Sequence, residues 1–191
     1  MKNDLTLERY LNDGVASLIR DALKATWHNP RASAFWARYS LAAAKAEARR
    51  QKVEGCGEHA PLFLIASIAS QCNLHCVGCY DRTNHIGAHI GAHISAASAS
   101  RMEMSAQDWR RIFDQAEKLG VSAILLAGGE PLTRMDVIEE ACRRPSILFP
   151  VFTNGTLMEG AVPRVFDAHR NLVPIVSLEG DENFTDARRG P

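Results

Sequence analysis

Apolar positions in the first 60 residues recur with a helical spacing. Between Leu7 and Ala22, apolar side chains recur every three or four residues. This spacing predicts an amphipathic helix over residues 5–27. Asn29 and Pro30 are typical of the start of a second helix, which continues through "RASAFWARYSLAAAKAEARRQK". The stretch "EGCGEHAP" then breaks the helical pattern. Residues 1–60 are therefore predicted to form a helical extension and a linker.

From residue 61 the pattern changes to short apolar runs separated by helical segments. The runs are "LFLIASIA" (62–69), "VSAILLA" (121–127), "ILFPVFT" (147–153) and "LVPIVSL" (172–178). Helices are predicted over 105–120, between Ser105 as N-cap and Gly120, and over 131–144, with a broken helical segment over 157–170. This alternation predicts an α/β fold with parallel strands and right-handed crossovers, and we expect both faces of the sheet to be covered.

Composition and charge exclude several classes of protein. Hydrophobic residues make up 46% and charged residues 23% of the 191, a mixture typical of globular proteins. The 22 basic residues balance 22 acidic ones, so no net field favours binding to nucleic acid or to an acidic membrane. The N-terminus lacks the apolar segment of a secretory signal, and no apolar run approaches the roughly 20 residues of a membrane span. We expect a cytoplasmic protein with reduced thiols.

A tandem repeat of "GAHI" lies between the first apolar run and the Ser105 helix. It places His85, His89 and His93 four residues apart, a spacing that would form a metal-binding stripe on a helix. Gly87 and Gly91 disfavour that helix. We interpret the segment as a loop of small residues expanded by repetition.

Three cysteines follow the first apolar run within the stretch "QCNLHCVGCY". Cys72, Cys76 and Cys79 could direct three thiolates at one metal centre, and thiolates select zinc, copper or iron–sulfur clusters over hard ions. The spacing alone does not choose among these centres.

A closed zinc or iron–sulfur site would need a fourth protein ligand. His75, His85 and Cys56 are the candidates for zinc, and Cys56 is a candidate for an iron–sulfur cluster. Cys142 is a poor candidate because it lies inside a predicted helix, with no turn to present it.

The cysteine stretch resembles the CxxxCxxC loop of radical S-adenosylmethionine (radical SAM) enzymes. In that family, too, the cysteine loop follows the first strand of the barrel. The segment "AGGEP" (127–131) resembles the family's glycine-rich segment. The resemblance implies a partial, incomplete TIM-like β/α barrel over residues 61–191, preceded by the N-terminal helical extension of residues 1–60. The sites then fall at the C-terminal ends of strands, where such barrels build active sites.

The resemblance also implies a cofactor pair and a reaction. Cys72, Cys76 and Cys79 would hold three irons of a [4Fe–4S] cluster, and the amino and carboxylate groups of S-adenosylmethionine would chelate the fourth. An electron donor of flavodoxin or ferredoxin type would reduce the cluster. Reductive cleavage of the sulfonium would then give a 5′-deoxyadenosyl radical that abstracts hydrogen from an unknown substrate.

Further residues match positions that contact S-adenosylmethionine in the family. Gly128 and Gly129 permit close approach to the methionine end, and Glu130 can accept bonds from its ammonium group. The remaining expected contacts are Asn154 after the third strand, Ser177 at the ribose, Arg189 at the carboxylate with Arg188 as the competing candidate, and Tyr80 at the adenine, since Gly78 replaces the usual aromatic residue.

The resemblance covers about residues 60–190, and the chain ends in "RRGP" just after the fourth predicted strand. The family's barrel usually has six strands. We therefore expect a fragment of a longer radical SAM enzyme or a truncated gene product. The alternative is a non-catalytic zinc or iron–sulfur module, or an inactive remnant.

Overall fold

The computed structural model describes residues 28–79 and 103–190, together with residues 14, 17, 20, 21 and 24. Most of the helix predicted over 5–27 lies outside this range. The same holds for Tyr80 and for the histidine repeat at 85, 89 and 93.

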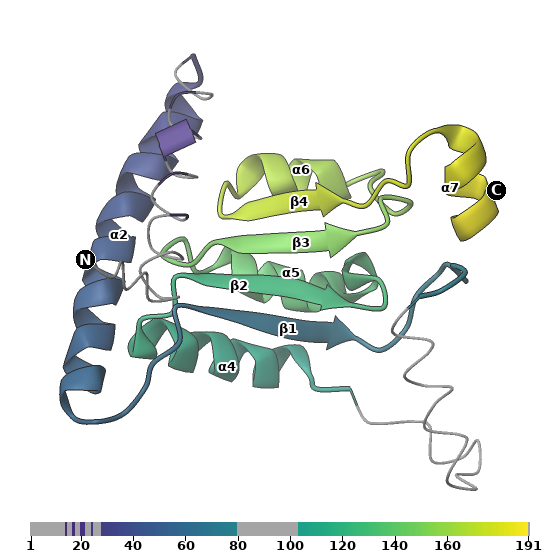
Figure 1. Cartoon of the computed structure of the whole chain (residues 1–191). Coiled ribbons are helices and arrows are strands. Elements are labelled where there is room, and N and C mark those ends of the chain that lie inside the picture. Colours follow the sequence, from purple (N-terminus) through teal and green to yellow (C-terminus); the bar gives the residue numbers. More distant parts are fainter. Residues whose placement is uncertain are drawn as a thin grey trace, which may run out of the picture.

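Four parallel strands form one sheet in the order of the sequence, β1-β2-β3-β4 (Figure 1). They are β1 (Phe63–Ala69), β2 (Ala123–Gly128), β3 (Phe149–Thr153) and β4 (Leu172–Val176). Each strand coincides with an apolar run of the sequence, β2 extending one residue beyond it, and the predicted parallel arrangement is confirmed. All four carboxyl ends therefore lie at one edge of the sheet, to the right in Figure 1.

The first helix between the strands begins and ends where the sequence indicates, and the later ones are shorter than predicted. Ser105 and Asp108 form a reciprocal capping box at the start of α4 (Ala106–Leu119), and Gly120 ends it with a φ of 93°. The next helical segment is divided into a 3₁₀ turn, η2 (Pro131–Arg134), and α5 (Met135–Cys142). The broken segment contains α6 (Val162–Ala168). A helix that was not predicted, α7 (Glu182–Arg189), follows β4.

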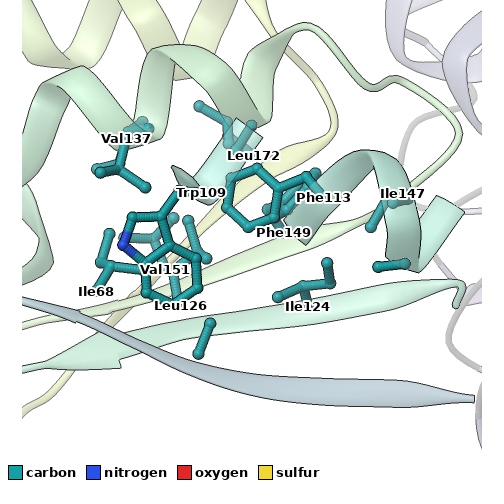
Figure 2. Close-up of a cluster of buried hydrophobic side chains, with 14 of the residues drawn as sticks. Ile68, Trp109, Phe113, Ile124, Leu126, Val137, Ile147, Phe149, Val151 and Leu172 are labelled. Atoms are coloured by element: carbon teal, nitrogen blue, oxygen red, sulfur yellow. The ribbon is translucent and has the colours of Figure 1, made fainter. Parts of the chain in front are cut away.

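One apolar core lies between the sheet and its helices (Figure 2). Phe113 of α4 meets Phe149 of β3 with ring centroids 5.2 Å apart, and both are fully buried. Val137 and Ile138 of α5 and Phe166 of α6 belong to the same cluster, so all three helices cover one face of the sheet.

The prediction that both faces of the sheet are covered is wrong for the described residues. On the face opposite the core, Ile65 is 69% exposed, and Phe63, Phe152 and Ile175 are also exposed. The reason is that four strands form only part of a barrel, so the face that a closed barrel would turn inward is open. A continuous apolar run marks a strand that needs both faces buried, but it does not supply the second layer.

The helix before the sheet, α2 (Pro30–Gly55), crosses the amino ends of the strands (Figure 1). The Asn29 side chain accepts a hydrogen bond from the Ala32 amide, as expected of an N-cap. The Tyr39 hydroxyl donates to the Ser122 carbonyl at 2.9 Å, and Arg50 donates to the Gly120 carbonyl. These bonds hold α2 on the turn between α4 and β2. None of the described helices is long and apolar enough to cross a membrane.

Candidate cofactor site

A pocket of about 330 Å³ lies at the carboxyl ends of the strands. Every predicted site residue within the described range lines it: Cys72, Cys76, Cys79, Gly128, Gly129, Glu130, Asn154, Ser177 and Arg189. Tyr80 lies outside the described residues. Segments more than 100 residues apart in the chain thus meet at one place, because parallel strands deliver their carboxyl ends to the same edge.

A larger hollow of about 870 Å³ lies on the opposite side, between α2 and the segments that follow α5 and α6. Its lining includes Arg31, Arg38 and Arg170, with Asp167 ion-paired to Arg170. Although this hollow is larger than the pocket at the strand ends, it is the weaker candidate for a cofactor site. It lacks the three cysteines and the strand ends that carry the chemistry.

Two glycines at the end of β2 allow its backbone to lie against the start of the cysteine loop. A Cβ on Gly128 would meet the Ala69 carbonyl oxygen at 2.3 Å, and one on Gly129 would meet the Gln71 carbonyl oxygen at 2.1 Å. Hydrogen bonds close the contact, from the Gly129 amide to the Ala69 carbonyl and from the Glu130 amide to the Gln71 carbonyl, both at 2.8 Å. Glycine is therefore required at both positions, because a side chain would clash with the backbone after β1. This close contact fixes where the cysteine loop begins.

Glu130 joins the ends of β2 and β3 through its buried carboxylate. Its Oε1 accepts hydrogen bonds from the Thr153 hydroxyl at 2.7 Å and the Leu132 amide at 3.0 Å, and its Oε2 accepts one from the Asn154 amide at 2.8 Å. The residue is only 1% exposed. A buried carboxylate of this kind is stabilised by such donors, so Glu130 is committed to holding the pocket's wall together.

The cysteine side chains are half-buried and line the same pocket. Within the described part of the chain, however, no three cysteine, histidine, aspartate or glutamate side chains are gathered closely enough to hold a metal ion. The loop touches α7, because the Val77 amide donates to the Arg188 carbonyl at 2.7 Å. The fold therefore brings the three thiols to one cavity without drawing them together at one point.

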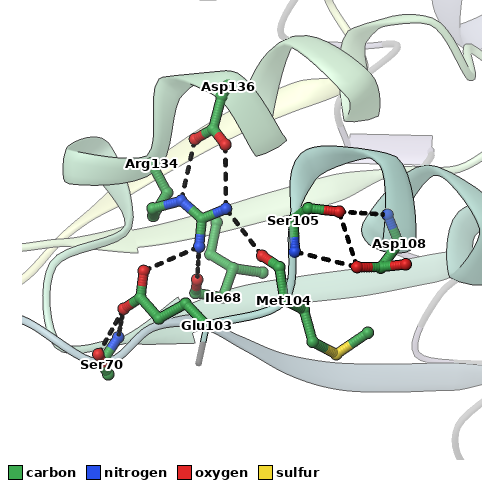
Figure 3. Close-up of polar contacts among 8 residues, drawn as sticks. All are labelled: Ile68, Ser70, Glu103, Met104, Ser105, Asp108, Arg134 and Asp136. Atoms are coloured by element: carbon green, nitrogen blue, oxygen red, sulfur yellow. Dashed lines mark hydrogen bonds and ion pairs between the residues drawn. The ribbon is translucent and has the colours of Figure 1, made fainter. Parts of the chain in front are cut away.

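Arg134 fastens both ends of the segment that carries the cysteines (Figure 3). Its guanidinium donates to the Ile68 carbonyl at the end of β1, and to Glu103 and the Met104 carbonyl just before α4, at 3.0–3.1 Å. Asp136 accepts the other two N–H groups at 3.0 Å, so all five donors are used. We call Arg134, Glu103, Asp136 and Ser70 the loop clamp.

Glu103 extends the clamp to the first residue after β1. It accepts hydrogen bonds from the Ser70 amide at 2.7 Å and from the Ser70 hydroxyl, and these donors hold the pKa of Glu103 below its usual value. Arg134 donates to both oxygens of Asp136, and this lowers the pKa of Asp136 as well. Both carboxylates are thus charged at neutral pH, when they hold the arginine best.

Arg189 of α7 also lines the pocket, and its side chain is 13% exposed. Its Nη2 donates to Glu179 Oε1 at 2.6 Å, and Arg188, which is half exposed, donates to Oε2 of the same carboxylate at 2.8 Å. The Arg189 hydrogen bond is the main cause of the lowered pKa of Glu179. Arg189 Nε is buried and has no hydrogen-bond partner among the described residues.

The sequence candidates for a fourth protein ligand are dispersed. Cys56 is exposed at the end of α2, at the other end of β1 from the cysteine loop. Cys142 ends α5 and lines the hollow beside α2, where burial raises the pKa of its thiol to about 11. His75 is exposed on the loop and does not line the pocket, and His85 lies outside the described residues.

Together these features define a class of protein, a partial parallel β/α barrel with a cysteine-lined pocket at the carboxyl ends of its strands. The chain belongs to the Radical SAM superfamily, whose family model matches residues 67–190. This confirms the resemblance noted in the cysteine loop and in "AGGEP".

Similar proteins from other organisms support the assignment to this family. A probable GTP 3′,8-cyclase of Methanothermobacter thermautotrophicus is 38% identical over 102 residues, which are 52% of this chain and 29% of the relative. A PqqA peptide cyclase of Ruegeria pomeroyi is 32% identical over 111 residues, 57% of this chain and 26% of that protein. The chain therefore spans less than a third of the length of either relative.

A crystal structure of Streptococcus suis SuiB is similar in fold, with a TM-score of 0.56 and 24% identity. The match covers 77% of this chain and 31% of SuiB. The likeness confirms the partial barrel expected from the sequence.

Several residues that shape the site were not among those predicted from the sequence. They are Arg134, Glu103, Asn73, Thr156 and Glu179. Each forms hydrogen bonds with a residue that is distant in sequence or lies in a neighbouring loop. Arg134, for example, donates to the carbonyl of Ile68, 66 residues earlier in the chain. Only Glu179 had a signal, since it lies in the "SLEG" segment next to Ser177.

Proposed function

We propose that this chain is the cofactor-binding part of a radical SAM enzyme, with residues 61–191 as the core and residues 1–60 as a helical extension. The observation that carries the proposal is the shared pocket. Three cysteines, the glycine-rich end of β2 and Arg189 line it together in a chain of this family. When bound, the [4Fe–4S] cluster and S-adenosylmethionine supply one-electron reductive cleavage of the sulfonium, giving methionine and a 5′-deoxyadenosyl radical.

The donor set fits an iron–sulfur cluster with one open iron. Cys72, Cys76 and Cys79 offer three soft sulfur ligands on a short loop with few regular contacts, which suits closure around a cluster. No fourth cysteine lines the pocket. The open coordination position is then available to the amino and carboxylate groups of S-adenosylmethionine.

The rest of the pocket supplies groups for each end of that molecule. Gly128 and Gly129 line the pocket and are assigned to the methionine ammonium, and the Arg189 guanidinium is assigned to the carboxylate. We assign Ser177, which follows β4 and lines the pocket, to the ribose, and Tyr80 to the adenine. Glu130 contributes by fixing these strand ends rather than through a free carboxylate.

For the substrate and the redox partner we propose a chemical class rather than a particular molecule. The named relatives are a GTP cyclase and a peptide cyclase, so radical generation is common to them while the substrate differs. We propose a one-electron donor of flavodoxin or ferredoxin type, a substrate that gives up a hydrogen atom and a cytoplasmic site of action, because low-potential clusters need a reducing compartment.

The test is anaerobic reconstitution of the chain with iron and sulfide, followed by iron analysis and absorption and EPR spectra. Wild-type protein is expected to bind about four irons per chain. Cys72→Ala, Cys76→Ala and Cys79→Ala are each expected to abolish the cluster, whereas Cys142→Ala retains it. Addition of S-adenosylmethionine should alter the EPR spectrum of the reduced wild-type cluster.

Two results would contradict the proposal. One is a single tetrahedral zinc ion bound with no response to S-adenosylmethionine, which would indicate the zinc module instead. The other is equal iron content in all four cysteine variants. Formation of 5′-deoxyadenosine with strong reductant then separates a catalytic chain from a remnant that binds its cofactors without turnover.

A further inference from the structure

Asn154 lies immediately after β3, with its side chain directed at the cysteine loop rather than into open space. Its backbone amide donates to Glu130 Oε2 at 2.8 Å, which fixes the main chain at this point. Its side-chain Nδ2 lies 3.8 Å from the Sγ of Cys72 and donates to Asn73 Oδ1 at 3.0 Å. The first cysteine of the loop is thus in contact with the end of the third strand.

The hydrogen-bond network fixes which end of the Asn154 amide faces the sulfur. Its Oδ1 accepts hydrogen bonds from the Thr156 amide at 3.0 Å and the Thr156 hydroxyl at 2.7 Å. A backbone N–H can only donate, so the atom that it meets must be the oxygen. The NH₂ group therefore faces Cys72.

A closed ring of three side chains supports the same orientation. Asn154 donates to Asn73, Asn73 donates to the Thr156 hydroxyl at 2.7 Å, and that hydroxyl donates to Asn154. Every donor in this ring meets an acceptor. Because Asn73 belongs to the cysteine loop and Thr156 follows β3, the ring also joins these two segments.

Cys72 Sγ receives a second N–H group, from the Leu74 amide at 3.5 Å. A neutral thiol is a weak acceptor, whereas a thiolate accepts hydrogen bonds well. Two donors on one sulfur therefore suit a charged, metal-bound Cys72. Cys72 lines the same cavity as Cys76 and Cys79, so a donor at its sulfur acts at the predicted cluster site.

We propose that Asn154 tunes the reduction potential of the cluster through its N–H···S hydrogen bond to Cys72, an inference that rests on the proposed function. Hydrogen bonds to ligand sulfurs help to set the potentials of iron–sulfur clusters. A donor stabilises the reduced cluster more than the oxidised one, because reduction adds negative charge to the sulfurs. Asn154 thus raises the potential and eases electron transfer into the cluster. Its amide is engaged within the protein and is a positioning and tuning group, not a ligand of S-adenosylmethionine.

The experiment is a redox titration of the reconstituted cluster, followed by EPR and without S-adenosylmethionine. Asn154→Ala and Asn154→Leu both remove the N–H donor without adding charge, so both potentials are expected to be more negative than that of wild type. Asn73→Ala breaks the ring but leaves the amide in place, and a smaller shift in the same direction is expected. Asn29→Ala, which removes an asparagine hydrogen bond at the distant start of α2, is the matched control and should leave the potential unchanged.

Failure of this inference differs from failure of the proposed function. A wild-type protein that binds no [4Fe–4S] cluster overturns both. If wild type forms the cluster but the potential is unchanged, or more positive, in Asn154→Leu and Asn154→Ala, the tuning role alone is overturned. If Asn154→Ala does not fold, Asn154→Leu, which keeps the side-chain volume and adds no charge, decides the question. A large loss of S-adenosylmethionine affinity at an unchanged potential would return Asn154 to the nucleotide site.

Discussion

Arg134 Nη1 and Glu103 Oε2 lie 3.0 Å apart, and this ion pair joins the turn after β2 to the residue that leads into α4. Glu103 in turn holds Ser70, 33 residues earlier, so the pair closes the base of the segment that carries the three cysteines. Holding the ends of a long loop together removes much of the entropy that its ligands would otherwise lose on binding a metal. The loop clamp is therefore expected to support the cluster without touching it.

Arg134→Gln should weaken retention of the cluster. The variant loses the ion pairs to Glu103 and Asp136 and some of the bonds to the Ile68 and Met104 carbonyls. Groups that support metal ligands typically contribute about 10- to 100-fold in metal affinity. We expect iron to be lost to a chelator about 10-fold faster than from wild type, as followed by the visible absorption of the cluster.

Arg144→Gln is the matched control for the clamp. Arg144 is also buried and bonded, to Asp114 and to the Arg110 and Glu140 carbonyls, but it lies among α4 and α5 away from the cysteines. It should lower the thermal midpoint of unfolding and leave the chelator rate unchanged below that temperature. Equal acceleration in both variants would mean that the clamp acts only through global stability.

Glu130→Ala should lower the free energy of unfolding of the chain. It leaves the Thr153 hydroxyl and the Leu132 and Asn154 amides without their acceptor, and each unmatched buried group costs about 1–3 kcal/mol. A loss of about 3 kcal/mol or more in urea unfolding is expected. Glu130→Gln keeps one acceptor oxygen and should lose less. The exposed Glu47→Ala should change stability by no more than about 0.5 kcal/mol, and a similar value for Glu130→Ala would disprove its bridging role.

Cys142 should react slowly with iodoacetamide at pH 8. Burial raises the pKa of its thiol from 9.0 to about 11, so the reactive thiolate is about 100-fold scarcer than for a thiol at 9.0. Labelling of the metal-free protein, followed by mass spectrometry, should modify the exposed Cys56 first. The Cys142 rate should rise as the pH approaches 11, because the thiolate fraction then increases. Equal rates at pH 8 would be inconsistent with a buried, protonated thiol.

Arg189→Ala should weaken binding of S-adenosylmethionine to the reconstituted protein and leave its iron content intact. A charged hydrogen bond contributes about 1.5–3 kcal/mol, so a loss of affinity of about 10-fold or more is expected by calorimetry. Arg188→Ala is the control, because Arg188 shares Glu179 but is half exposed. The reverse result, with Arg188 the sensitive residue, would assign the carboxylate to Arg188 instead.

The sequence by itself determined the strands and most helices of this fold and marked most of the residues that line the pocket. Apolar runs marked β1 to β4, Ser105 and Gly120 marked the ends of α4, and the cysteine spacing with "AGGEP" indicated the family. These are local signals, because a strand needs a run of apolar side chains and a helix end needs a cap within a few residues.

Only the tertiary structure decided how those residues are held. It turned the Glu130 carboxylate into a bridge between strands, set the two glycines against the backbone of the cysteine loop, and placed the Asn154 amide at Cys72. It also left one face of the sheet open where the apolar runs had predicted cover. Such contacts join residues far apart in the chain, and their geometry depends on how parallel strands and loops pack, which no local pattern specifies.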